Sequence, residues 1–134
     1  MLIPGFATAE GTARFRERFA ARLPGHIREA QGLWISSIGI GTYLGEPTAA
    51  YDARYREAVM QAVLMGVNVI DSAINYRQQR SERAIAQALA ALISSGEVQR
   101  DEVILATKGG FRPSTAKNRR TLLPISRRNS WTPA

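Results

Sequence analysis

Hydrophobic residues recur at two different spacings along this chain, and the spacing predicts its elements. Short runs of β-branched and aliphatic residues at 37–41, 67–71 and 103–107 predict strands. Between them lie longer stretches in which apolar positions are three and four residues apart, which predicts helices of about a dozen residues. Parallel strands need a crossover connection, and a helix of this length supplies one. The pattern therefore predicts an α/β fold with a parallel sheet.

Each of the two predicted helices carries a start and a stop signal. We expect Asp52 to cap the first helix and Ser81 to cap the second, because both side chains can accept hydrogen bonds from free first-turn amides. Gly66 and Gly96 follow the last apolar positions, where a left-handed residue commonly ends a helix. The intervening loop, Gly41–Pro47, has turn composition throughout.

Residues 1–25 predict a helical extension in front of the α/β region. Phe15, Phe19 and Leu23 are four apart among arginines and form one apolar stripe, which ends at Pro24-Gly25. We expect the arginine-rich face of this helix to be solvated.

A small hairpin is predicted between the extension and the first parallel strand. His26–Glu29 and Leu33–Ser36 flank Ala30-Gln31-Gly32, a short connection with glycine where a left-handed residue is wanted.

The net charge of +7 comes from one end of the chain. Residues 112–134 hold six basic and no acidic residues, which leaves twelve of the eighteen basic residues against all eleven acidic ones in residues 1–111. No helix or strand period organises this tail, so we expect it to be disordered. Its cations could bind nucleic acid or an acidic partner, which is the alternative, non-enzymatic interpretation. Only Phe111 and Trp131 could stack on bases there, so no specific nucleic-acid binding is expected.

Composition excludes several kinds of chemistry. The sequence has no cysteine and a single histidine, His26, so disulfides, thiolate metal sites, histidine metal clusters and a Ser/His/Asp triad are excluded, and no metal site is predicted. No apolar run reaches the roughly 18 residues that span a bilayer, and Met1–Glu10 lacks the features of a secretory signal. We therefore predict a cytoplasmic protein without a membrane partner.

A dinucleotide-binding fold is one candidate, because glycines at 39, 41 and 45 follow a strand and Asp71 ends the next one. In that fold the helix begins at the glycines, so that its first amides face the pyrophosphate. Here the glycine spacing differs by one residue, and residues 46–51 intervene before the predicted helix start. The pattern disfavours this interpretation.

A second candidate site lies where strands end. Asp71 ends one predicted strand, Tyr76 is in the loop that follows, and Lys108 comes directly after the next strand. In a barrel of parallel strands these ends face one side, so the three residues would converge. A phenol has an unperturbed pKa near 10, so a tyrosine that donates a proton near neutrality needs a nearby cation. Lys108 could be that cation, with Asp71 as its counter-charge.

Taken singly, each of these residues has a simpler interpretation. Asp71 could cap a loop, Tyr76 could pack, and Lys108 could be a solvated charge. Together, and with the neighbouring glycines and serines, they favour an acid relay.

Five segments of the chain resemble aldo-keto reductases over residues 26–111. The segments are Ile38–Tyr43, Gly66–Ala73, Tyr76, Arg80–Ile85 and Ala106–Lys108. The resemblance implies a partial (β/α)8 TIM barrel made of the N-terminal hairpin and the first three βα units. It implies Tyr76 as proton donor to a small-molecule carbonyl, an aldehyde or ketone, with Lys108 and Asp71 as partners. It also implies hydride transfer from NADPH, and Thr42, Tyr43 and Asp71 near the nicotinamide and its ribose.

Two departures from the family pattern bear on activity. The family's catalytic histidine follows a fourth strand, and most of its cofactor-binding residues come from the last third of the barrel. A complete barrel takes roughly 250 residues, against 134 here. We therefore expect this chain to be an inactive fragment by itself, and to need an oligomer or a complementing fragment.

Overall fold

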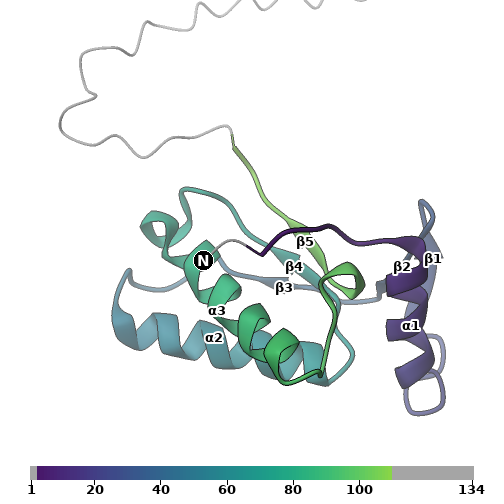
Figure 1. Cartoon of the computed structure of the whole chain (residues 1–134). Helices are drawn as coiled ribbons and strands as arrows, with labels where there is room; N and C mark the ends of the chain where they lie inside the picture. Colours follow the sequence, from purple (N-terminus) through teal and green to yellow (C-terminus); the bar gives the residue numbers. More distant parts are fainter. Residues whose placement is uncertain (1–2, 110–134) are drawn as a thin grey trace, which may run out of the picture.

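Three short parallel strands lie at the centre of the structure, a computed structural model that describes residues 3–109. The sheet contains β3 (Ile40–Gly41), β4 (Val69–Asp71) and β5 (Ile104–Ala106), in that order. The connections contain α2 (Ala49–Leu64), the 3₁₀ turn η1 (Tyr76–Gln79), α3 (Arg80–Ser94) and the 3₁₀ turn η2 (Arg100–Glu102). Both helices cover the same face of the sheet (Figure 1).

The strands are in a register that aligns their C-terminal ends. Gly41 of β3 pairs with Asp71 of β4, and Asp71 pairs with Ala106 of β5. The predicted α/β class with parallel strands is thus confirmed. The described residues contain three parallel strands, a separate two-stranded antiparallel sheet and no closed barrel, and within them no helix follows β5.

The core lies between the helices and the sheet. Val59 and Val63 of α2 are buried, and so are Ile85, Ala88, Leu89 and Leu92 of α3, at the three- and four-residue spacing that predicted the two helices. The buried hydrophobic residues that form this cluster are Phe15, Phe19, Ile27, Val59, Val63, Ile70, Ile85, Ala88, Leu89, Leu92, Val98 and Val103. The cluster fixes the sheet against the helices and so fixes the strand ends that carry the candidate site.

The predicted helix caps are wrong at both helices. The cap of α2 is Thr48, whose hydroxyl accepts a hydrogen bond from the Tyr51 amide, and Asp52 lies inside the first turn. α3 begins at Arg80, so Ser81 is already helical, and its hydroxyl donates to the Thr42 carbonyl at 2.6 Å. Both side chains have partners from other elements, which is why the helices start before them.

The hairpin is confirmed. β1 (Ile27–Ala30) and β2 (Leu33–Ser36) are antiparallel, with Ala30 opposite Leu33. The two connecting residues, Gln31 and Gly32, have φ values of 54° and 76°. Positive φ at both central positions is the geometry of the type I′ turn that closes two-residue hairpins.

α1 (Ala9–Phe19) forms in the predicted extension and packs beside the hairpin (Figure 1). Phe15 and Phe19 are buried, as their spacing predicted. The arginine face is partly solvated, with 42% of the Arg14 side chain and 40% of the Arg18 side chain exposed, but it is also paired: Arg14 lies 2.7 Å from Asp101 and Arg18 lies 2.7 Å from Glu102. These carboxylates belong to η2, so the extension is tied to the turn that leads into β5.

Asn68, just before β4, joins the hairpin to the sheet. Its side chain is fully buried, accepts a hydrogen bond from the Ser36 amide at 2.9 Å, and donates to the carbonyl groups of Trp34 at 2.8 Å and Glu102 at 3.3 Å. The backbone amide of Asn68 also donates to the Ser36 hydroxyl. One amide side chain thus connects β2, β4 and η2.

The basic tail predicted for residues 112–134 lies outside the described residues. Within residues 3–109, no helix is long and apolar enough to cross a membrane.

Candidate active site

Asp71 and Lys108 meet at the C-terminal edge of the sheet. Asp71 is the last residue of β4 and pairs with Ala106, so Lys108 follows two residues beyond the neighbouring strand. The Lys108 ammonium donates to Asp71 Oδ1 at 2.6 Å and to the Ser72 carbonyl at 3.0 Å. About half of each side chain is exposed, 45% for Asp71 and 53% for Lys108. Strand register therefore brings together two residues that are 37 positions apart in the sequence.

Tyr76 reaches the same edge from η1. The Lys108 Nζ lies 5.0 Å from the centre of the Tyr76 ring, and the Tyr43 ring lies edge-on to it with 5.0 Å between ring centres. The three residues predicted to form an acid relay are thus neighbours.

The surroundings of the Lys108 ammonium shift its pKa. The hydrogen bond to the Asp71 carboxylate raises the pKa of Lys108 above its ordinary value of 10.5, partial burial opposes the rise, and the nearby Tyr76 side chain adds to it. Lys108 is therefore a cation throughout the neutral range.

The two other predicted cofactor-binding residues differ in accessibility. Tyr43 is 64% exposed beside Tyr76, whereas Thr42 is fully buried. The Thr42 hydroxyl donates to the Asp71 carbonyl at 2.9 Å and lies 3.2 Å from the Ser72 hydroxyl. The Thr42 side chain thus links the end of β3 to the end of β4 and fixes the backbone of Asp71.

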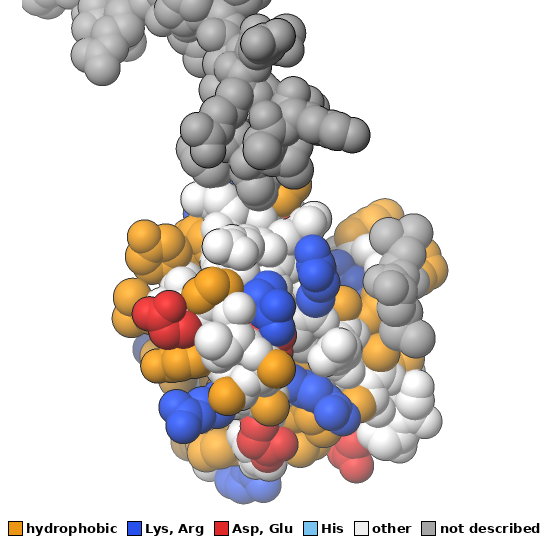
Figure 2. Space-filling view, turned by 90° about the vertical axis from the view of Figure 1, so that its left-hand side faces the viewer, with side chains coloured by type: hydrophobic (Ala, Val, Ile, Leu, Met, Phe, Trp, Pro, Cys, Tyr) orange, Lys and Arg blue, Asp and Glu red, His pale blue; other side chains and the backbone are white. Residues whose placement is uncertain are grey.

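The face that carries these strand ends is chemically mixed. Figure 2, which views this side of the molecule, shows basic, acidic and hydrophobic side chains interspersed rather than one uniformly charged surface. No group of three acidic or histidine side chains within residues 3–109 could hold a metal ion.

Sequence reasoning missed one buried cation next to the site. The side chain of Arg77 is 1% exposed, and its guanidinium lies 2.6 Å from Asp52. Neither residue carried a signal of this contact, since an arginine in a polar loop is usually solvated.

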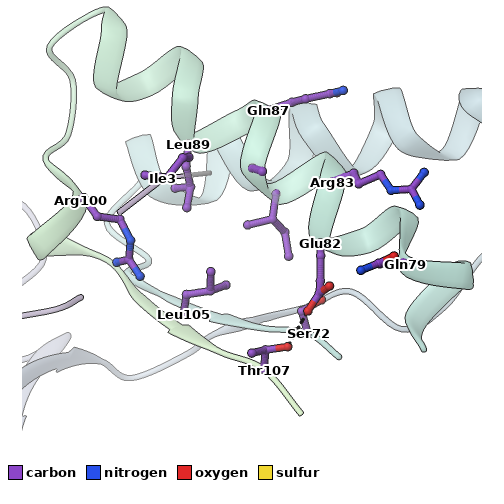
Figure 3. A pocket seen from close by; sticks show the side chains of 12 residues that line it. Ile3, Ser72, Gln79, Glu82, Arg83, Gln87, Leu89, Arg100, Leu105 and Thr107 are labelled. Atoms are coloured by element: carbon purple, nitrogen blue, oxygen red, sulfur yellow. Dashed lines mark hydrogen bonds between the residues drawn. The ribbon is translucent and has the colours of Figure 1, made fainter. Parts of the chain in front are cut away.

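A cavity of about 620 Å³ lies between α3 and β5. Figure 3 shows Leu89 of α3 opposite Leu105 of β5, with Arg100 at one end and Arg83 near the other. Its lining is mainly apolar and includes neither Tyr76 nor Lys108. The cavity borders β5, an outer strand of the described sheet, and its lining includes Ser72 and Thr107, the residues next to Asp71 and Lys108, so one end of it lies beside the candidate active site.

Comparison with known proteins gives one family. The model of the aldo/keto reductase family matches residues 37–127. The match begins after the hairpin and extends beyond residue 111, where the resemblance seen in the sequence ended. A search of curated proteins found no significant match. The matched residues cover more than half of the chain and include Thr42, Tyr43, Asp71, Tyr76 and Lys108. The chain belongs to the aldo/keto reductase family.

Proposed function

We propose that this chain forms part of an NADPH-dependent reductase that converts a small aldehyde or ketone to an alcohol, with Tyr76 as the proton donor. Family membership indicates an oxidoreductase, and the family generally uses NAD(P)H. The observation that carries the proposal is the contact of Tyr76 with Lys108, which is itself hydrogen-bonded to Asp71.

In this proposal the side chains handle the proton. The Tyr76 hydroxyl donates its proton to the carbonyl oxygen of the substrate, and the Lys108 ammonium stabilises the phenolate that remains. Asp71 holds the ammonium in place through Oδ1. NADPH, when bound, supplies the hydride that reduces the carbonyl carbon.

The residues at the strand ends fit one end of this cofactor. Asp71 Oδ2 accepts no hydrogen bond within residues 3–109, so a ribose hydroxyl could donate to it, and the exposed Tyr43 ring offers an aromatic surface. Thr42 would act through its backbone or through Asp71, because its hydroxyl is engaged internally.

We also propose that catalysis needs further βα units, from a complementing fragment or from other copies of this chain. A barrel of this kind has eight strands, and the described residues supply three, of which β3 and β5 are outermost. Ile38, just before β3, is 62% exposed and Leu105 of β5 is 38% exposed, as expected for flanks that pack against another element.

The proposed function is tested with the purified chain by NADPH fluorescence titration and by the loss of NADPH absorbance with a simple aromatic aldehyde. Saturable binding, with turnover lost in Tyr76→Phe and kept in Tyr51→Phe, would support it. Tyr51 is the matched control because it lies in α2, away from the Lys108 contact. Absence of NADPH binding in every oligomeric state detected by light scattering would mean that this chain is an inactive piece of a reductase, and turnover that is kept in Tyr76→Phe would refute the role of Tyr76.

A further inference from the structure

The residues that follow Tyr76 have an unusual backbone conformation. Arg77, Gln78 and Gln79 have φ values of 49°, 57° and 67°, which lie in the left-handed region. Residues with a Cβ rarely adopt this region even singly, because of steric crowding with the backbone. Three in succession persist only where other contacts hold them.

The Arg77 side chain provides such contacts. Its guanidinium donates to the carbonyl of Glu46 through Nε at 3.2 Å and Nη2 at 3.1 Å, and to the carbonyl of Thr48 at 3.3 Å. It also faces the Tyr55 ring, with 4.8 Å from the guanidinium carbon to the ring centre. Arg77 therefore joins the Tyr76 segment to the loop that leads from β3 into α2.

Asp52 holds both ends of the same segment. Its Oδ1 lies 2.6 Å from Arg77 Nη2, and its Oδ2 lies 2.6 Å from Arg80 Nη2. Arg77 begins the left-handed stretch and Arg80 is the first residue after it. Because Asp52 is fixed in the first turn of α2, one carboxylate clamps the stretch from each side.

The clamped segment determines where Tyr76 points. Tyr76 is adjacent to Arg77, and its ring contacts Tyr43 and Lys108. A change of φ at Arg77 to negative values would rotate the chain next to Tyr76 and move the ring away from both neighbours. Arg77 Nε and Nη2 make all of the hydrogen bonds of this guanidinium, and Nη1 is buried with no partner among the described residues.

We propose that Arg77 and Asp52 are positioning residues for Tyr76: they hold residues 77–79 in the left-handed conformation and so keep the phenol beside the Lys108 ammonium. The catalytic meaning of this placement rests on the proposed function, whereas the placement itself is a property of the folded chain.

The experiment measures the nuclear Overhauser effect between the rings of Tyr43 and Tyr76 in the full-length chain with labelled tyrosine. Tyr43→Phe and Tyr76→Phe assign the two signals. The test variants are Arg77→Lys, which keeps the charge but loses the forked donor, and Asp52→Asn, which keeps the size. Glu102→Gln is the control, because it breaks the ion pairs of Glu102 with Arg14 and Arg18 of α1, far from Tyr76.

We expect the Tyr43–Tyr76 cross peak in the unaltered chain and in Glu102→Gln. In both test variants we expect the cross peak to be lost or strongly reduced at a temperature where the variant is folded. An unchanged cross peak in Arg77→Lys and Asp52→Asn, or its absence from the unaltered chain, would overturn the proposal. Failure of both test variants to fold would also overturn it, in favour of a purely structural role. Because the readout needs no cofactor, a chain that binds no NADPH would leave this result standing.

Discussion

Replacing Asn68 with alanine should remove a large part of the stability of the described fold. The substitution deletes three side-chain hydrogen bonds and leaves the buried Ser36 amide without its acceptor. A buried donor that loses its partner costs about 1–3 kcal/mol, and a typical hydrogen bond contributes about 1 kcal/mol. Water can reach the partly buried Trp34 carbonyl, and the bond to Glu102 is long at 3.3 Å. We therefore expect a loss of about 3 kcal/mol in the free energy of unfolding.

Urea unfolding followed by far-ultraviolet circular dichroism measures this loss. Asn75→Ala is the matched control, because Asn75 is exposed, and we expect it to change the free energy by less than about 0.5 kcal/mol. Asn68→Asp should be worse than alanine at neutral pH, since a carboxylate would face the carbonyl groups of Trp34 and Glu102. Its protonated form can donate, so part of the loss should return as the pH falls. A cost below about 1 kcal/mol for Asn68→Ala would refute the reasoning.

Three further predictions concern the turn after Tyr76, its carboxylate clamp and the first helix. Gln78→Gly should raise the free energy of unfolding by about 1 kcal/mol, because glycine adopts the left-handed conformation without strain. Gln87→Gly, in the middle of α3, is the control and should lower the free energy of unfolding by about 1 kcal/mol. Urea unfolding measures both changes. Burial pushes the pKa of Asp52 upward, but hydrogen bonds from Arg80 and Arg77 outweigh it and hold the pKa below 3.8. The ionised Asp52 carboxylate therefore stabilises the fold fully above pH 3.8, and this stabilisation is lost as the pH falls through the lower pKa that Asp52 has in the folded chain. The difference in Tm between the unaltered chain and Asp52→Asn should therefore shrink below about pH 4. A constant difference from pH 7 to pH 3 would contradict this assignment. Gly11→Ala should cost about 1–3 kcal/mol, because the new Cβ would lie 2.3 Å from the Asp101 carbonyl oxygen, while Gly41→Ala, with open space around it, should be nearly neutral by the same urea assay.

The sequence predicted the elements whose signals are periodic and local. Short β-branched runs alternating with helical spacing indicated a parallel sheet, and strand ends are where parallel sheets gather polar residues, so Asp71 and Lys108 could be placed together before any coordinates. Their contact depends only on the strand register, which pairs Asp71 with Ala106.

What could not be predicted depends on contacts between distant segments. Asp52 and Thr48 are both good cap residues, and the choice between them follows from the pairing of Asp52 with Arg77 and Arg80. The left-handed turn at Arg77 has no local signal either, because glycine or asparagine usually marks this conformation. Asn68 sits in a β-branched run, and its role appears only once the hairpin lies beside it.

The attachment of α1 has a consequence for the order of events during protein synthesis. The Thr8 amide donates to the carbonyl of Asp101, and the Thr8 hydroxyl donates to the Asp101 carboxylate. The two residues are 93 positions apart in the sequence. At about 5–20 residues per second, a ribosome needs several seconds to make the intervening chain. During that time α1 has no η2 to bind, and the buried faces of Phe15 and Phe19 are without part of their cover. α1 therefore spends this interval as an exposed amphipathic segment, available to chaperones before η2 reaches it.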